Sequence, residues 1–272
     1  MDQKKRKMKA NNQTNEPAAP EIVIEVRDLH ASFDGLDILS GVSFTALKGE
    51  VTVILGGSGS GKTTLLKHLL SLYPVEEGSI RVLGRDLKSL REVEQVELYL
   101  QMGVFYQTGA LLNSLTVAEN VALPLEQHTN LPAAMIRDLV RMKLGLVNLE
   151  HALHMYPSQL SGGMLKRAAL ARAIALDPPI LFCDEPGAGL DPISLESLDN
   201  LILNLKDQLG ISIIMVTHEV SSIMRVASKI VYLDRGRVVF EGPLEKALES
   251  DIRSVHDFFS VLKSKKAREL IR

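Results

Sequence analysis

The residues "GGSGSGKTT" combine glycines with a lysine and two threonines, and this combination can hold a chain of phosphates. The stretch fits G-x-x-x-x-G-K-[ST], follows the apolar run "VTVIL" and precedes helix-type sequence, which is the context that the motif requires. Its glycines let backbone N–H groups curl around phosphates, and a helix N-terminus adds partial positive charge. Lys62 would reach the β- and γ-phosphates, and the Thr63 hydroxyl would ligate Mg²⁺. The predicted phosphate-binding residues are Gly56, Gly57, Ser58, Gly59, Ser60, Gly61, Lys62, Thr63 and Thr64.

Two adjacent carboxylates, Asp184 and Glu185, follow the apolar run "ILFC". They would stand at the carboxyl end of a buried strand, where open α/β sheets place their ligand sites. Asp184 would hold Mg²⁺ opposite Thr63, and Glu185 would orient and deprotonate an attacking water. The neighbouring Cys183 is expected to be a buried structural thiol rather than a redox switch.

A second glycine-containing stretch, "SQLSGGMLKR", also looks like an anion-binding helix start. Ser161, Gly162 and Gly163 would supply a hydroxyl, backbone donors and a helix dipole. The stretch has no P-loop lysine and no strand directly before it. It can therefore complete a phosphate site, but we do not expect it to hold a nucleotide alone.

These groups need a sheet to position them, and the hydrophobic pattern supplies one. The segments "EIVIEVRDLHASFDG" and "ILSGVSFTALKGEVTVIL" predict three strands, and "GSIRVLGRDL" predicts a hairpin. The runs "PILFCDEP" and "ISIIMVTH", separated by the helix "SLESLDNLILNLKDQLG", predict a parallel, doubly wound sheet, and "KIVYLDRGRVVFEGP" predicts a last hairpin. We assign residues 21–87 and 173–250 to this α/β core and residues 88–172 to an inserted helical lobe.

The composition agrees with one such domain in a reducing compartment. The 272 residues are 46% hydrophobic and 24% charged, and the net charge of −2 gives no general case for nucleic-acid binding. The apolar runs are strand-length and shorter than a membrane span, and one cysteine cannot form an internal disulfide.

Both ends of the chain have a polar character that leaves two interpretations open. Residues 1–20 are expected to be a disordered basic tail that either improves solubility or touches anionic lipid headgroups. Residues 251–272 are expected to form a helical tail, which either caps the domain or docks on a second chain or on headgroups.

Taken together, six motifs resemble those of ABC-transporter ATPase subunits. They are "GGSGSGKT", "FYQTGALL", "LSGGM", "ILFCDEP", "GLDP" and "MVTHE", in the order that this family has, and the resemblance covers Ile22 to Pro243. It implies a P-loop NTPase (RecA-like) core with a mostly parallel sheet, an N-terminal antiparallel β part and an inserted helical subdomain. It also implies a head-to-tail dimer that encloses two ATP molecules with Mg²⁺. Ser161 and Gly163 of one chain would then meet the γ-phosphate held by the other chain.

The same resemblance implies roles for four further residues. Gln107 would ligate Mg²⁺ and report to a membrane partner, and Asp191 matches the aspartate of the D-loop. His218 would lie near the γ-phosphate at the end of an apolar strand. Phe33 stands where an aromatic side chain, commonly tyrosine, stacks on adenine.

Within the family, the stretch "FYQTGALLNSLTVAENVALPLEQHTNLP" is similar to the Mce-associated ATPases of Mla-type phospholipid transporters. The implied partners are an integral-membrane permease pair, an Mce-type lipid-binding protein and a small STAS-type subunit. The implied place is the cytoplasmic face of the inner membrane. The ATPase of an amino-acid importer or of a lipoprotein-release complex is the alternative. A cassette that acts on DNA or ribosomes is disfavoured, because the chain has one cassette, one cysteine and a slightly acidic balance.

Overall fold

Residues 20–260 are described by a computed structural model of the chain, and they contain two β-sheets. The larger sheet has six strands in the order β10-β9-β3-β8-β7-β6. These strands are β3 (Val51–Gly56), β6 (Met102–Phe105), β7 (Ile180–Asp184), β8 (Ser212–Val216), β9 (Lys229–Asp234) and β10 (Arg237–Pro243). All neighbouring pairs are parallel except β9 and β10, which form the predicted terminal hairpin.

The smaller sheet is antiparallel and has the order β2-β1-β4-β5. Its strands are β1 (Ile22–Phe33), β2 (Leu36–Leu47), β4 (Glu77–Val82) and β5 (Arg85–Asp86). The predicted turn at Asp34 and Gly35 connects β1 to β2, and both residues have the positive φ that such a tight turn requires. The predicted mostly parallel core and N-terminal antiparallel part are therefore confirmed.

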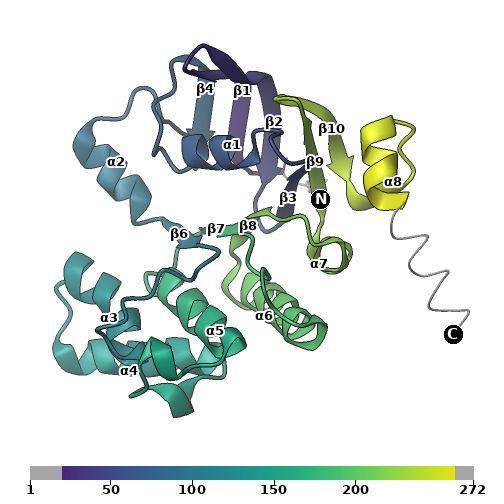
Figure 1. Ribbon diagram of the computed structural model, residues 1–272. Coiled ribbons are helices and arrows are strands. Elements are labelled where there is room, and N and C mark those ends of the chain that lie inside the picture. The colour runs from purple at the N-terminus through teal and green to yellow at the C-terminus, as the bar shows by residue number, and fades with distance from the viewer. Residues whose placement is uncertain (1–19, 261–272) are drawn as a thin grey trace, which may run out of the picture.

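Within residues 20–260, a further helical stretch begins at residue 253, and eight complete α-helices and two 3₁₀ turns surround the sheets. They are α1 (Lys62–Leu69), α2 (Glu92–Tyr99), α3 (Val117–His128), α4 (Ala133–Leu146), α5 (Gly162–Ala173), α6 (Pro192–Leu209), α7 (Val220–Val226), α8 (Leu244–Leu248), η1 (Glu150–Ala152) and η2 (Pro157–Gln159). Figure 1 shows α1 beside β1, β2 and β4, whereas α3, α4 and α5 gather on the other side of β6 and β7.

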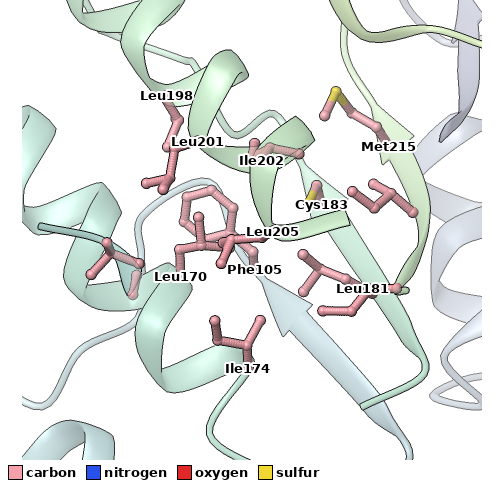
Figure 2. Close-up of a cluster of buried hydrophobic side chains, with 14 of the residues drawn as sticks. Phe105, Leu170, Ile174, Leu181, Cys183, Leu198, Leu201, Ile202, Leu205 and Met215 are labelled. Atoms are coloured by element: carbon pink, nitrogen blue, oxygen red, sulfur yellow. The ribbon is translucent and has the colours of Figure 1, made fainter. Parts of the chain in front are cut away.

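Strand β3 is buried along its whole length, because it packs against both of these layers. Val51, Val53 and Leu55 belong to the core cluster that includes α3 to α6, whereas Ile54 belongs to the cluster that includes α1 and the antiparallel sheet. Successive side chains of a strand point to opposite faces, so a continuously apolar run is what a strand covered on both faces needs. Figure 2 shows side chains of β6, α5, β7 and α6 meeting in the first cluster.

The helical lobe departs from its predicted range at one place. β6 lies inside the range 88–172, but it pairs in parallel with β7 and so belongs to the main sheet. Its sequence "MGVF" is a four-residue apolar run, and a run of that length fits a strand and a buried helix turn equally well. Along the chain, the helical segment with α3, α4 and α5 therefore begins after β6 and ends before β7.

At the C-terminal end, residues 253–260 are helical. Val255 and Phe259 are buried in the core cluster, and the Phe258 ring meets the Tyr232 ring edge-on at 5.8 Å. This part of the predicted helical tail packs on the domain. The predicted basic tail up to residue 19 and the residues from 261 onward lie outside the described residues.

Candidate functional site

The predicted phosphate loop lies between β3 and α1, and two of its glycines allow a close approach of backbone segments. Gly56 has φ 151°, and a Cβ there would come within 2.2 Å of the Leu233 carbonyl oxygen and 2.5 Å of Ser60 Oγ. Gly61 has φ 101°, and a Cβ there would lie 2.7 Å from a methyl group of Leu39. Side chains at these positions would force the loop away from the sheet.

The loop offers donors that are free to bind an anion. Gly61 is the N-cap of α1, and it has no side chain that could accept from the first-turn amides. The buried hydroxyl of Ser60 has no hydrogen-bond partner among the described residues. Lys62 Nζ lies in the same loop, donating to the carbonyl oxygens of Gly56 and Gly57 at 2.8 and 2.9 Å. Orphaned donors and a lysine around one loop fit a phosphate chain.

A depression opens over this loop, and its floor includes a residue that sequence reasoning missed. Ile38 of β2 lines it together with the residues 59–64. An isoleucine in a strand has no distinctive spacing, so the sequence could not separate it from ordinary sheet residues. Its apolar side chain gives the depression a surface suited to a sugar or a base.

Asp184 and Glu185 lie at the carboxyl end of β7, as predicted. Glu185 has φ 45°, an unusual conformation for a residue with a side chain, and its amide donates to the Val216 carbonyl at the end of β8 at 2.8 Å. Burial raises the pKa of Asp184, and the neighbouring charge of Glu185 raises it further. A cation between Asp184 and bound phosphates would relieve this cost.

The residue types predicted to hold Mg²⁺ suit that ion. A carboxylate, the Thr63 hydroxyl and the Gln107 side-chain amide all offer oxygen, which is the ligand atom that Mg²⁺ prefers. Within residues 20–260, no three side chains of His, Cys, Asp or Glu are grouped to hold a metal ion. Magnesium sites that also use phosphate oxygens need only one or two carboxylates, so the residues present fit such a site.

His218 lies directly against Glu185. Its Nδ1 is 2.7 Å from Glu185 Oε1, and its backbone amide donates to Oε2 at 3.4 Å. The histidine side chain is 70% exposed, whereas the Glu185 side chain is 16% exposed. The sequence placed His218 at a strand end near the phosphates, and the fold brings it to the carboxylate proposed as the base.

Phe33 ends β1 and is 42% exposed. Its ring packs at a tilt against Tyr73, with 5.2 Å between ring centroids, and Tyr73 in turn contacts His68. Phe33 therefore has an aromatic support behind it and an accessible surface, as a base-stacking side chain requires.

The second glycine stretch begins α5, as predicted. Ser161 is the N-cap, and its Oγ accepts from the Met164 amide at 3.3 Å. Positions 162 and 163 face the segment of Asp191: a Cβ on Gly162 would lie 3.8 Å from Leu190, and one on Gly163 would lie 3.9 Å from Ser194 Oγ. Ser161 and Asp191 are both exposed, so this surface is open to another molecule.

Asp191 itself caps α6. Its carboxylate accepts from the amides of Ile193 and Ser194, each at 3.0 Å, and from the Ser194 hydroxyl at 2.5 Å. These hydrogen bonds lower the pKa of Asp191, with the Ser194 hydroxyl as the largest cause. Next to it, Ile193 exposes 82% of its surface.

Gln107 follows β6 and is exposed, and its backbone carbonyl accepts a hydrogen bond from Lys166 of α5. Arg172, also on α5, donates to the carbonyls of Ala110 at 2.8 Å and Gly109 at 3.1 Å. Sequence reasoning missed both cations, because the spacing along the chain gives no sign of contacts made across more than fifty residues.

Comparison with known proteins now decides the family. The sequence profile described as "ABC transporter" matches residues 39–188, which is more than half of the chain and includes the phosphate loop, the α5 start and both carboxylates. The chain belongs to the ABC transporter family.

Curated relatives of this ABC protein have two kinds of name. The intermembrane phospholipid transport system ATP-binding protein MlaF of Haemophilus influenzae is 41% identical over 86% of this chain and 89% of that protein. Its namesake in Escherichia coli K12 is 37% identical over 81% and 82%, respectively. The probable ribonucleotide transport ATP-binding protein mkl of Mycobacterium tuberculosis H37Rv is 41% identical over 88% of this chain and 67% of that protein.

Solved structures agree with this membership. CbiO1 from Clostridium perfringens, part of the ABC transporter complex cbiONQ, has a TM-score of 0.80 at 25% identity and covers 93% of this chain and 100% of that chain. The dimeric post-hydrolysis ATP-binding cassette MJ0796, bound to ADP and Pi, has a TM-score of 0.74 at 29% identity, with coverage of 81% and 98%. The chain is thus the ATP-binding and ATP-hydrolysing subunit of an ABC transporter, a class of protein that typically works as a dimer with permease partners. No helix in residues 20–260 is long and apolar enough to cross a membrane.

Proposed function

We propose that this ATPase powers phospholipid transport by an Mla/Mce-type complex at the cytoplasmic face of a bacterial inner membrane. The observation that carries the proposal is the 41% identity to the MlaF protein of Haemophilus influenzae, which extends over 89% of that protein. The partners would be a second copy of this chain, a pair of permease subunits, an Mce-type lipid-binding protein and a small STAS-type subunit. Nucleic acid is not among them.

In the proposed reaction, the loop between β3 and α1 holds the phosphates of ATP. Lys62 neutralises charge on the β- and γ-phosphates, and Phe33 stacks on the base. Thr63, Asp184 and Gln107 hold Mg²⁺, which neutralises phosphate charge when it is bound. The backbone N–H groups of the loop, which contains Gly56, Gly59 and Gly61 as well as Ser58 and Ser60, donate hydrogen bonds to the phosphates.

Hydrolysis is assigned to the pair of Glu185 and His218. Glu185 orients an attacking water and accepts its proton, because a carboxylate beside the γ-phosphate is within proton-transfer reach. The contact of His218 Nδ1 with Oε1 holds the carboxylate in one orientation. The unusual φ of Glu185 supports this role, because strained backbone often concentrates at sites of chemistry.

The second copy completes each nucleotide site. Its Ser161 and Gly163 would meet the γ-phosphate, and Asp191 would lie at the contact between the two chains. Support comes from the exposure of Ser161 and Asp191 and from the nearby Ile193, whose 82% exposed side chain suits an interface that closes in the dimer.

A groove beside Gln107 is suited to a permease segment. It is lined mainly by apolar residues, among them Met102 and Val104 of β6, and its lining also includes Tyr106, Pro124 and Arg172. Because Tyr106 precedes Gln107 directly, a helix of the membrane subunit lying there would contact the segment that carries the proposed Mg²⁺ ligand. This arrangement gives a short path from nucleotide to permease.

The test is purification of the full-length chain from its own membranes with detergent, followed by identification of the bound subunits and lipids. We expect a permease and an Mce-type protein to co-purify. We also expect the purified complex to transfer labelled phospholipid from one vesicle population to another in an ATP-dependent way. Co-purification of a soluble amino-acid-binding protein, or of lipoprotein-release subunits, would contradict the lipid assignment.

The name of the mycobacterial relative favours one other cargo. At the same 41% identity, that protein is described as a probable ribonucleotide transport ATPase. Measuring ATP turnover of the reconstituted complex with phospholipid and then with ribonucleotides separates the two cargoes, because transported substrate stimulates the motor that carries it.

A further inference from the structure

Lys166 is a buried lysine that the proposed reaction does not yet use. It lies in the second turn of α5 and only 6% of its surface is exposed, although lysines are seldom buried unless they are paired. Its ammonium donates to the Gln107 carbonyl oxygen and lies 5.7 Å from the centroid of the Phe105 ring. Within the described part of the chain it has no ion-pair partner.

A second buried lysine has the ion pair that usually stabilises a buried ammonium group. Lys143 of α4 is 1% exposed, and its ammonium forms an ion pair with Asp177. Lys166 has no such partner among residues 20–260: burial lowers the pKa of Lys166, and the negative charge of Glu185 acts in the opposite direction. Glu185 has the same effect on Lys62 of the phosphate loop. For two lysines, Lys166 on α5 and Lys62 on α1, burial thus lowers the pKa and the Glu185 carboxylate acts to raise it.

The position of Lys166 along α5 is as informative as its burial. The helix starts at Ser161, the residue proposed to meet the nucleotide of the second copy. Gln107 is proposed to act on the nucleotide of its own chain. The hydrogen bond from Lys166 therefore joins an element that serves one nucleotide to a segment that serves the other.

Further contacts connect α5 to residues 107–110. Arg172 holds the carbonyls of Gly109 and Ala110, about two turns further along α5. A Cβ on Gly109 would lie 3.2 Å from the Ala169 methyl carbon, so the loop and the helix are in close contact between the two cations. A displacement of α5 would carry the backbone of residues 107–110 with it.

We infer that Lys166 is a positioning residue that couples the two nucleotide sites of the dimer. Contact of Ser161 with the second copy's nucleotide shifts α5, and Lys166 transmits the shift to the main chain at Gln107. The inference rests on the proposed roles of Ser161 and Gln107. It adds that the ammonium of Lys166, rather than the helix contact alone, carries the signal.

The test compares Lys166→Met with Lys166→Arg in the full-length chain. Methionine keeps an unbranched stem of similar volume and removes the donor, so we expect the melting temperature and the ATP dissociation constant to stay near wild type. We expect kcat to fall about tenfold, since misplacing a positioned group can cost up to a hundredfold, and the Hill coefficient for ATP to fall towards one. Arginine retains a donor and should restore most of the turnover.

Two further measurements separate this role from a structural one. If Lys166 acts through Gln107, adding Lys166→Met to a Gln107→Ala chain should cause no further loss of kcat. The matched control is Lys143→Met, which should lower the melting temperature and leave kcat of the folded enzyme unchanged.

Wild-type kcat in Lys166→Met, or losses that multiply in the double variant, would overturn the inference. Full turnover in Gln107→Ala alone would contradict instead the role proposed for Gln107. Lipid transfer is not among these readouts, so a wrong cargo would not affect them.

Discussion

Residue 218 contacts both oxygens of the Glu185 carboxylate: its ring nitrogen Nδ1 is 2.7 Å from Oε1, and its backbone amide donates to Oε2 at 3.4 Å. The carboxylate is largely covered and the histidine is largely exposed. The Glu185 carboxylate is therefore oriented by His218, which follows the carboxyl end of β8, and the His218 side chain remains accessible to a ligand. The proposed base and its neighbour differ in exposure, and they should respond differently to substitution.

Replacing Glu185 with glutamine should stop hydrolysis without preventing ATP binding. The amide keeps the size and a hydrogen-bond acceptor for the His218 amide, but it cannot take a proton from water. We expect kcat to fall at least about a hundredfold, the scale of a lost general base. Size-exclusion chromatography with ATP should then show a stable dimer. Unchanged turnover in this variant would refute the role of Glu185.

Shared sites predict that two inactive chains can rescue one another. A Lys62→Ala chain keeps its Ser161, and a Ser161→Arg chain keeps its Lys62. In a mixed dimer one nucleotide meets both intact groups, so about a quarter of wild-type turnover should return when half of the dimers are mixed and each has one working site of two. A chain that carries both substitutions, mixed with either single variant, is the control. Mixtures as inactive as their parts would argue against shared sites.

The ionised side chain of Asp184 should lower the free energy of unfolding at neutral pH. Burial and the adjacent Glu185 raise the pKa of Asp184 above its ordinary 3.8, so the folded state holds this proton more tightly than the unfolded state does. The stability that the carboxyl contributes is present below its unfolded pKa and is lost as the pH rises through its raised folded pKa.

We therefore expect Asp184→Asn to melt at a higher temperature than wild type at about pH 8, with the difference shrinking towards about pH 4. The same variant should lose ATP turnover. Melting curves across this pH range provide the measurement. A variant that is less stable than wild type at the high end would contradict the electrostatic account of this site.

Cys183 should be chemically silent in the folded protein. It is buried in β7 as the sequence indicated, and burial raises the pKa of its thiol, with Asp184 contributing in the same direction. Thiolate is the reactive form, so iodoacetamide should label Cys183 only after unfolding. Mass spectrometry of native and urea-treated samples measures this directly. Rapid labelling of the native protein would show that β7 opens.

The sequence was most informative where local chemistry and strand periodicity coincide. The phosphate loop, the carboxylates at the end of β7 and the α5 start each carry residue types with a physical reason for their spacing, and each adjoins a clear apolar run. β6 was absorbed into the helical lobe because four apolar residues have no measurable period.

Contacts made by the fold itself were out of reach of the sequence. Lys166 and Gln107 are far apart along the chain, and Lys166 looks there like one of several basic residues on an ordinary helix. Ile38 looked like an ordinary strand residue until β2 was placed over the loop. In both cases the missing information was which backbone lies beside which side chain.

The capping bond of Ser161 has a consequence for the polarity of the α5 start. Its oxygen uses one lone pair to accept from the Met164 amide, and the hydroxyl hydrogen remains available to donate. A group arranged in this way can give a hydrogen bond to an incoming molecule. That suits an oxygen-rich anion. The bond that caps the helix therefore leaves a hydrogen-bond donor at the exposed end of α5.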